Sequence, residues 1–247
     1  MPISISDCSF MYRRGLPVLE GLSLSLGHGA TVLLGPNGAG KSTLLGLAAS
    51  ALQPRSGHVR ISGLDSRNRK DIKAYRRKVA WLPQQIKPIP GLRVREQVAH
   101  AGWLKGMTRV DAWNSSKEAL NKVGLADLST RRSTELSGGQ KRRLGIAQAL
   151  VHSAEIVLMD EPTAGLDPMQ RATFRDLVGK LCSTVAVVVS THQTEDLADI
   201  YQSVVVLGQG RVRHQGTVDS FLELAPAGTP AERQAEAAYA TIFAAEV

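Results

Sequence analysis

Short apolar runs and alternating stretches predict the strands of this protein. Residues 3–10 and 18–26 alternate apolar and polar side chains, as strands of an antiparallel sheet with one solvated face do. Residues 30–34, 156–159 and 185–190 are almost continuously apolar, which is typical of strands buried on both faces of a parallel sheet. The pattern therefore predicts an α/β fold, with a mainly parallel core sheet and an N-terminal antiparallel β layer.

Longer stretches with helical spacing lie between these strands. Residues 93–124 carry two apolar stripes at helical spacing, and a further helical pattern follows residue 140. Together they predict a helical subdomain at about residues 85–150, inserted into the core. We expect one domain over residues 1–224 and a tail over 225–247, which opens with a Pro/Gly linker and continues as a helix. The contact stripe expected on that helix consists of Tyr239, Ile242 and Phe243.

Composition and charge exclude only a few classes of protein. The chain has 247 residues and a formal net charge of +8, which suits nucleic acid, a polyphosphate or an anionic membrane surface equally well. Its two cysteines, Cys8 and Cys182, have no metal-ligand or disulfide spacing, as expected in a reducing cytosol. The longest apolar run is far too short to span a bilayer, and no signal peptide is expected. Residues 67–78 are rich in Lys and Arg and are expected to form a solvated helical face.

A glycine-rich motif of the form G-x-x-x-x-G-K-S follows the expected strand at residues 30–34. It consists of Gly35, Pro36, Asn37, Gly38, Ala39, Gly40, Lys41 and Ser42, followed by Thr43 at the start of a helical pattern. A tight turn between a strand and a helix lets successive backbone N–H groups face the phosphates of a nucleotide. Lys41 adds a positive charge that reaches the terminal phosphates, and the Ser42 hydroxyl can bind Mg²⁺. An ordinary glycine turn does not account for so many matching positions, so the motif predicts a P-loop NTPase core.

Two carboxylates end the apolar run at residues 156–159. Asp160 and Glu161 follow that run directly, where the carboxyl end of a buried strand is expected. Phosphate chemistry needs one carboxylate to hold Mg²⁺ and another to orient or deprotonate the attacking water. In isolation the pair could be a solvated strand end, but after a P-loop it predicts a catalytic site.

The stretch Leu136-Ser137-Gly138-Gly139-Gln140 resembles the signature motif of the ATP-binding subunits of ABC transporters. Further elements of that family occur in the family's order, over about residues 3–221. Tyr12 resembles the aromatic residue that stacks on adenine, and Gln84 resembles the glutamine of the loop between core and helical subdomain. Asp167 lies in a stretch similar to the D-loop, and His192 resembles the switch histidine.

The resemblance implies roles for these residues. Glu161 is the implied general base, His192 bonds the γ-phosphate, and Gln84 senses the metal and the water. Asp160 holds Mg²⁺, and Asp167 bridges two subunits. The implied assembly is a head-to-tail dimer, in which the signature of one subunit closes on the ATP of the other. The implied nucleotide contacts made in this way are Ser137, Gly138, Gly139 and Gln140.

The resemblance also implies partners. These are transmembrane permease subunits and a second ATP-binding subunit, either an identical chain or a homologue, with ATP and Mg²⁺ as cofactors and no nucleic acid. The chain is then expected on the cytoplasmic face of a membrane. Residues 136–149 and 160–168 resemble the branch that serves small bacterial exporters, so export is the expected direction. Ile86 and Ile89, in a proline-rich loop, and Trp103, on the following helix, are expected to be exposed and to meet a membrane partner.

Three alternatives use the same kind of cassette. The ATPase heads of DNA-repair and chromosome-organising proteins carry a long coiled coil, whereas the interval from Lys41 to Asp160 has no sustained heptads. Translation factors of this family carry two cassettes in one chain, and this sequence has one P-loop. A soluble ABC-type ATPase that acts on a non-membrane partner stays open.

Overall fold

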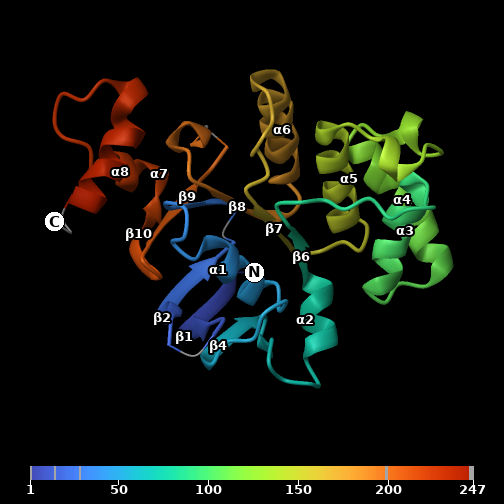
Figure 1. Ribbon diagram of the computed structural model, residues 1–247, viewed down its shortest axis with the longest axis horizontal. Helices are drawn as coiled ribbons and strands as arrows, with labels where there is room; N and C mark the ends of the chain where they lie inside the picture. The colour runs from blue at the N-terminus through green and yellow to red at the C-terminus, as the bar shows by residue number, and fades with distance from the viewer. Residues whose placement is uncertain (1, 14, 28, 198–199, 245–247) are drawn as a thin grey trace.

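The computed structural model describes residues 2–13, 15–27, 29–197 and 200–244, which form two sheets and the helices around them (Figure 1). The larger sheet has the strand order β10-β9-β3-β8-β7-β6. Its strands are β3 (Ala30–Leu34), β6 (Val79–Leu82), β7 (Ile156–Asp160), β8 (Ala186–Thr191), β9 (Ser203–Gly208) and β10 (Arg211–Thr217). All neighbouring pairs are parallel except β9 and β10. The predicted mainly parallel sheet is confirmed.

The smaller sheet is antiparallel and has the order β2-β1-β4-β5. Its strands are β1 (Ile3–Met11), β2 (Pro17–Leu26), β4 (Ser56–Ile61) and β5 (Leu64–Asp65). Ile3 and Ile5 on β1 are buried while Ser4 and Ser6 are more exposed, which is the alternation that the sequence shows. The predicted N-terminal antiparallel layer is therefore confirmed.

Two hydrophobic cores lie on the two faces of the larger sheet. Leu33 of β3 packs in the core that contains α1 (Lys41–Ala48) and the smaller sheet, whereas Val32 and Leu34 pack in the core on the opposite face. Because successive side chains of a strand point to opposite faces, a strand covered on both sides must be apolar at every position. This explains why β3 is apolar except at Thr31, whose buried hydroxyl lies 2.8 Å from Ser203 Oγ on β9.

The remaining helices lie mostly around the larger sheet. They are α2 (Ile72–Lys78), α3 (Val94–Leu104), α4 (Arg109–Lys122), α5 (Gly138–Leu150), α6 (Pro168–Leu181), α7 (Val218–Leu222) and α8 (Gln234–Ala244). Short 3-10 turns occur at η1 (Ala126–Leu128), η2 (Ser133–Glu135), η3 (Thr194–Asp196) and η4 (Ala231–Arg233). Figure 1 shows α3, α4 and α5 grouped at one end of the molecule and α8 at the other, beyond β10. Within the described residues, no helix is both long and apolar enough to cross a bilayer.

The tail forms a helix, as predicted. α8 buries Ala238, and its expected stripe of Tyr239, Ile242 and Phe243 is partly buried against the larger core. Residues 245–247 lie outside the described part of the chain.

Two expectations about surface residues need correction. The basic stretch at residues 67–78 is helical only over α2, and two of its arginines hold other segments. Arg76 Nε donates to Ser50 Oγ at 2.9 Å, and Arg77 donates to the carbonyl oxygens of Lys105 and Gly106 at 3.2 and 3.0 Å. These arginines therefore stabilise the structure besides facing solvent.

The proline-rich loop is also less exposed than expected. Ile86 and Ile89 are half-buried, and Ile86 packs against the larger core. The reason lies on α5, where Gly145 has no side chain and any Cβ there would collide with Ile86. Trp103, on the neighbouring helix α3, is 48% exposed, as expected.

Candidate nucleotide site

The glycine-rich motif forms a tight turn between the end of β3 and the start of α1. Gly38 and Gly40 have φ angles of +83° and +100°, in the left-handed region that residues with a Cβ rarely adopt. A side chain at Gly35 would collide with the carbonyl oxygen of Leu207 on β9. The turn therefore depends on glycine at these positions, and it leaves the backbone N–H groups at the start of α1 free of side-chain caps.

Lys41 begins α1 and is only 4% exposed. Its Nζ donates to the carbonyl oxygens of Gly35 at 2.7 Å and Pro36 at 3.2 Å, and lies 3.6 Å from Glu161 Oε1. Burial lowers the pKa of Lys41, while the charges of Glu161 and Asp160 oppose that shift. The ammonium group is thus held across the turn, where it can neutralise a bound phosphate.

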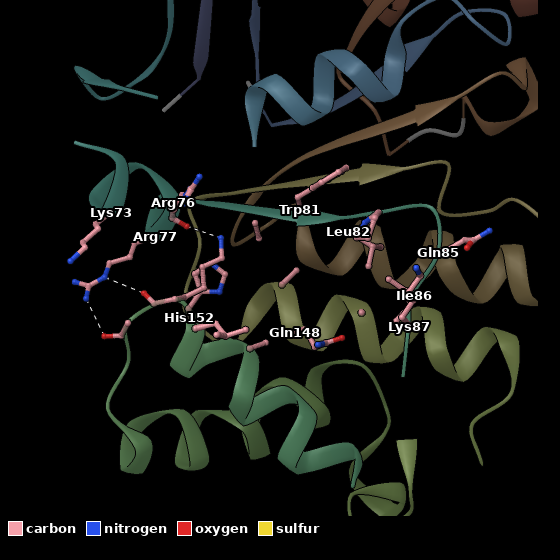
Figure 2. A pocket seen from close by; sticks show the side chains of 18 residues that line it. Lys73, Arg76, Arg77, Trp81, Leu82, Gln85, Ile86, Lys87, Gln148 and His152 are labelled. Carbon is pink, nitrogen blue, oxygen red and sulfur yellow. Dashed lines mark hydrogen bonds between the residues drawn. The ribbon is translucent and has the colours of Figure 1, made fainter. Parts of the chain in front are cut away.

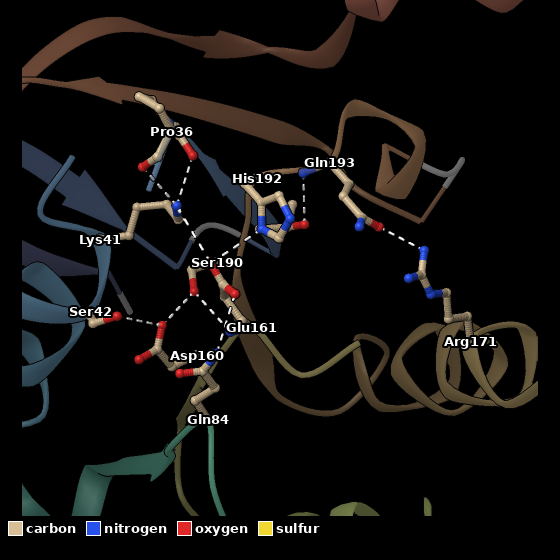
Figure 3. A network of polar contacts seen from close by, with 12 residues as sticks. Pro36, Lys41, Ser42, Gln84, Asp160, Glu161, Arg171, Ser190, His192 and Gln193 are labelled. Atoms are coloured by element: carbon tan, nitrogen blue, oxygen red, sulfur yellow. Dashed lines mark hydrogen bonds and ion pairs between the residues drawn. The ribbon is translucent and has the colours of Figure 1, made fainter. Parts of the chain in front are cut away.

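Asp160 is held by two serines at the carboxyl end of β7 (Figure 3). Its Oδ1 accepts hydrogen bonds from Ser42 Oγ at 3.0 Å and from Ser190 Oγ at 2.8 Å. Ser190 Oγ also accepts from the backbone N–H of Glu161 at 3.0 Å. Since β7 and β8 pair Asp160 with Ser190, the sheet itself brings these groups together.

Ser190 was not among the predicted site residues. Its signal in the sequence is weak, since a serine at the end of a buried strand is common. Its place two residues before His192 is the only sequence feature that points to it.

The oxygens of Ser42 and Asp160 fit the magnesium ion that the sequence predicts. A hydroxyl and a buried carboxylate 3.0 Å apart are oxygen donors of the kind that Mg²⁺ prefers. Gln84 lies on the other side of Glu161, with its Nε2 at 3.5 Å from Glu161 Oε2, so its amide is near this cluster without touching Asp160 in any described hydrogen bond.

Glu161 is the point at which the predicted catalytic residues meet. Its Oε1 lies 3.3 Å from His192 Nδ1 and 3.6 Å from Lys41 Nζ, and Figure 3 shows these side chains pointing toward one another. Gln84 approaches the second carboxylate oxygen. The Glu161 carboxylate, the His192 ring and the Lys41 ammonium group are therefore close enough together to contact the same reacting group of a bound ligand.

Tyr12 lies beside this cluster. Its side chain is 64% exposed, and its hydroxyl is 3.1 Å from Thr43 Oγ1 in the first turn of α1. The hydroxyl end of the ring therefore lies next to the P-loop, and the adenine contact of Tyr12 stays a prediction.

The signature residues, 137–140, lie apart from the P-loop at residues 35–43. Ser137 caps α5, with Ser137 Oγ accepting from Gln140 N at 3.3 Å and Gln140 Oε1 accepting from Ser137 N at 3.0 Å. Asp167 caps α6, where its Oδ1 accepts from Gln170 N at 2.8 Å. Within the described residues, no hydrogen bond or ion pair joins residues 137–140 to residues 35–43. One chain thus presents the P-loop cluster and the signature as separate surfaces.

Comparison with known proteins identifies the family. Residues 19–164 match the family model described as ABC transporter. The chain is 34% identical to a phosphonates import ATP-binding protein of Thiobacillus denitrificans, with 87% of each chain covered. It is 35% identical to a cobalt import ATP-binding protein of Rhodobacter capsulatus, with 87% of this chain and 78% of the relative covered. The chain belongs to the ATP-binding subunits of ABC transporters.

Solved structures of this family support the same assignment. The dimeric structure of the ATP-binding cassette MJ0796 in a post-hydrolysis state, bound to ADP and Pi, superimposes with a TM-score of 0.77 at 27% identity. The match covers 87% of this chain and 98% of that one. As a member of this family, the chain is an ATP-binding ATPase with a P-loop fold.

Proposed function

We propose that this ABC ATPase powers a membrane exporter and acts as a head-to-tail dimer with a second ATP-binding subunit. The observation that carries the proposal is the convergence of Lys41, Glu161 and His192 beside the Ser42–Asp160 pair, at the carboxyl ends of β3, β7 and β8. Ligands of open parallel sheets bind at this edge.

Each residue of the cluster has a role in this proposal. The backbone N–H groups of residues 35–43 surround the β- and γ-phosphates, and Lys41 neutralises their charge. Ser42 and Asp160 would hold Mg²⁺, with Gln84 as a further contact, and the ion would supply positive charge against the charge that develops on the phosphates. Glu161 takes the proton of the attacking water. These roles rest on the distances given above.

The outer residues complete the nucleotide contacts. His192 bonds the γ-phosphate and orients the attack, and Tyr12 stacks on the adenine ring. Because the signature lies apart from the P-loop, we assign Ser137, Gly138, Gly139 and Gln140 to the ATP of a partner subunit. The N-terminus of α5 favours an anion there. Asp167 lies at the same subunit boundary in this proposal.

The membrane partner is proposed to be a pair of transmembrane permease subunits that hold this chain on the cytoplasmic face. We divide the chain into a cassette at residues 1–224, with its helical subdomain at about 85–150, and a tail at 225–247. The resemblance of residues 136–149 to small bacterial exporters favours export. The two relatives named above are import proteins, and this is the competing observation for direction.

Purification of the full chain from solubilised membranes tests the function. We expect a membrane-spanning subunit to remain bound and ATP hydrolysis to be retained in the complex. Inside-out vesicles that contain the complex should accumulate the cargo if the direction is export, and right-side-out vesicles if it is import. A complex with a soluble protein, and none with a membrane subunit, would contradict the proposal and favour the soluble ATPase.

A further inference from the structure

The two edges of the larger sheet carry different features outside the nucleotide cluster. At the β6 edge lies a hollow of about 860 Å³ between α2, β6, α3 and α5, with Trp81 and Leu82 in its middle (Figure 2). At the other edge, beyond β10, lies the tail helix α8 (Figure 1). A series of contacts connects α8 to the P-loop, and it passes through the turn between β9 and β10.

The first of these contacts joins Phe243 of α8 to Gly208, the last residue of β9. A Cβ added at Gly208 would lie 2.7 Å from Cε1 of the Phe243 ring, which is closer than Cβ atoms come to other atoms. The ring therefore packs directly on the backbone, and the lack of a side chain at Gly208 makes room for it. Tyr239, one turn earlier on α8, packs on the same ring, with the two ring centroids 4.7 Å apart.

The turn at residues 207–210 contacts the P-loop at two points. The carbonyl oxygen of Leu207 lies so close to Gly35 that a Cβ on Gly35 would be 2.3 Å from it. The backbone N–H of Gly210 donates to the carbonyl oxygen of Ala39 at 3.1 Å. The turn therefore lies between the tail helix and the P-loop, and its position limits where the P-loop backbone can lie.

This turn has a conformation that needs support from its surroundings. Gln209 and Gly210 have φ angles of +48° and +73°, as in the tight turns that join two antiparallel strands. Glycine adopts this conformation freely, whereas glutamine does so at a cost. Arg213 Nε donates to the carbonyl oxygen of Gly208 at 3.3 Å, and the Phe243 ring covers the same residue. These contacts hold the turn in place.

We infer that the tail helix positions the P-loop for the nucleotide and that Phe243 is the positioning residue. Its ring fixes the turn at residues 207–210, and the turn fixes the P-loop backbone at Gly35 and Ala39. Phe243 acts through these contacts and does not touch the nucleotide. The inference rests on the assignment of the P-loop to the phosphates in the proposed function, and it adds a role for the tail.

Phe243→Ala in the full chain tests this role. Without the ring the turn is less well held, so we expect the Kd and the KM for ATP to rise about tenfold, since small displacements of binding groups are costly. The kcat should change by less than about twofold, because the P-loop binds the phosphates before and during the reaction alike. Phe243→Leu keeps an apolar side chain over Gly208 and should recover most of the affinity. Nucleotide titration and steady-state hydrolysis measure these values.

Ile242→Ala is the matched control. Ile242 is half-buried on the same helix and packs against the larger core, as Phe243 does. Its loss should lower the midpoint of thermal unfolding, as Phe243→Ala should, but leave the affinity for ATP unchanged. An equal loss of affinity in both variants would show a general effect of lost packing and would overturn the role of Phe243.

Gly208→Ala tests the same contact from the other side. The added Cβ would collide with the Phe243 ring, whereas Arg213, 3.1 Å away, needs to move by only a few tenths of an ångström. We therefore expect Gly208→Ala to weaken ATP binding about as much as Phe243→Ala. The double variant should bind ATP no more weakly than Phe243→Ala alone, because the ring no longer occupies that space. Additive losses would overturn the inference, and Gly208→Ala keeps it testable if Phe243→Ala does not fold.

Lys41→Ala separates this inference from the proposed function. The proposed function requires Lys41→Ala to lose affinity for ATP. If it does so while Phe243→Ala keeps the Kd and KM of the wild type, the role of the tail is wrong and the proposed function stands. If Lys41→Ala binds ATP as the wild type does, the assignment of the P-loop fails, and the inference fails with it.

Discussion

Glu161 has a backbone conformation that side chains rarely adopt. Its φ is +42°, in the left-handed region, which costs a residue with a Cβ about 1 kcal/mol or more. The bond from its N–H to Ser190 Oγ holds it there, and the turn directs its carboxylate toward Lys41 and His192. Strain that the surrounding structure maintains is common at functional sites, which supports the assignment of Glu161 as the base.

Glu161→Gln should separate binding from turnover. The amide keeps the size and much of the hydrogen bonding but cannot take a proton, so we expect ATP hydrolysis to fall by about 10²–10⁴-fold with ATP affinity retained. Steady-state hydrolysis and nucleotide titration check this. Glu155→Gln, at an exposed ion pair with Lys78 just before β7, is the matched control and should hydrolyse ATP normally. A rate for Glu161→Gln close to that of the wild type would contradict the role.

His152 predicts a pH-dependent stability. Burial, with a smaller contribution from the charge of Lys105, lowers the pKa of His152 to about 4, against about 6.5 in an unfolded chain. Below pH 6.5, His152 therefore binds a proton in the unfolded state but not in the folded state. This contribution to stability is fully present above pH 6.5 and is lost as the pH falls toward 4.

Urea unfolding at several pH values between 7 and 4.5 measures this effect. The free energy of unfolding of the wild type should fall, relative to His152→Gln, by on the order of 1 kcal/mol between pH 7 and 5. Because the two proteins have the same carboxylates, the contribution of these groups to the pH dependence drops out of the difference. Parallel pH curves for the two proteins would show that His152 titrates normally.

At the scale of elements, two helices begin in the same way but serve different purposes. Thr108 caps α4, with its Oγ1 accepting from Asp111 N at 3.1 Å, and Ser137 caps α5 through Gln140 N at 3.3 Å. Only the second cap belongs to the signature motif. The pair therefore separates the cost of losing a cap from the loss of a nucleotide contact.

Thr108→Ala and Ser137→Ala should each lower the free energy of unfolding by about 1 kcal/mol, because each leaves a helix-end N–H without its side-chain acceptor. Only Ser137→Ala should also weaken association of the chain in ATP and Mg²⁺. Chemical unfolding and light scattering give the two readouts. If Thr108→Ala weakened association equally, lost stability would be the cause and the assignment of Ser137 to the partner's ATP would fail.

At the scale of the whole molecule, the P-loop cluster and the signature are two separate surfaces of one chain. Figure 1 shows α5, which begins with the signature, in the helical group at one end, while α1 follows the P-loop near the centre. Two copies arranged head to tail would place each signature opposite a P-loop. In the proposed dimer, each copy would supply the P-loop of one site and the signature of the other.

Glu161→Gln in ATP and Mg²⁺ should therefore form a dimer, because nucleotide that is bound and not hydrolysed keeps the two halves together. Light scattering should give twice the mass seen with ADP. The double variant with Lys41→Ala, which removes the charge facing the phosphates, is the control and should stay monomeric. A monomer at high protein concentration with ATP would contradict the homodimer and leave a dimer with a homologous subunit as the proposal.

The sequence by itself determined those features that depend on interactions between neighbouring residues. The turn at residues 35–42 could be predicted because glycines with positive φ and a following helix start are properties of neighbouring residues. The apolar run at residues 156–159 predicted a strand covered on both faces, and β7 is such a strand. The ABC family followed from motifs in a fixed order.

Tertiary structure decided what depends on residues far apart in the chain. Ser190 binds Asp160 only because β7 and β8 pair in a particular register. Ile86 is half-buried because Gly145, far along the chain, leaves room for it. A pattern of neighbouring residues carries no information on such contacts, since they form only when packing brings distant segments together.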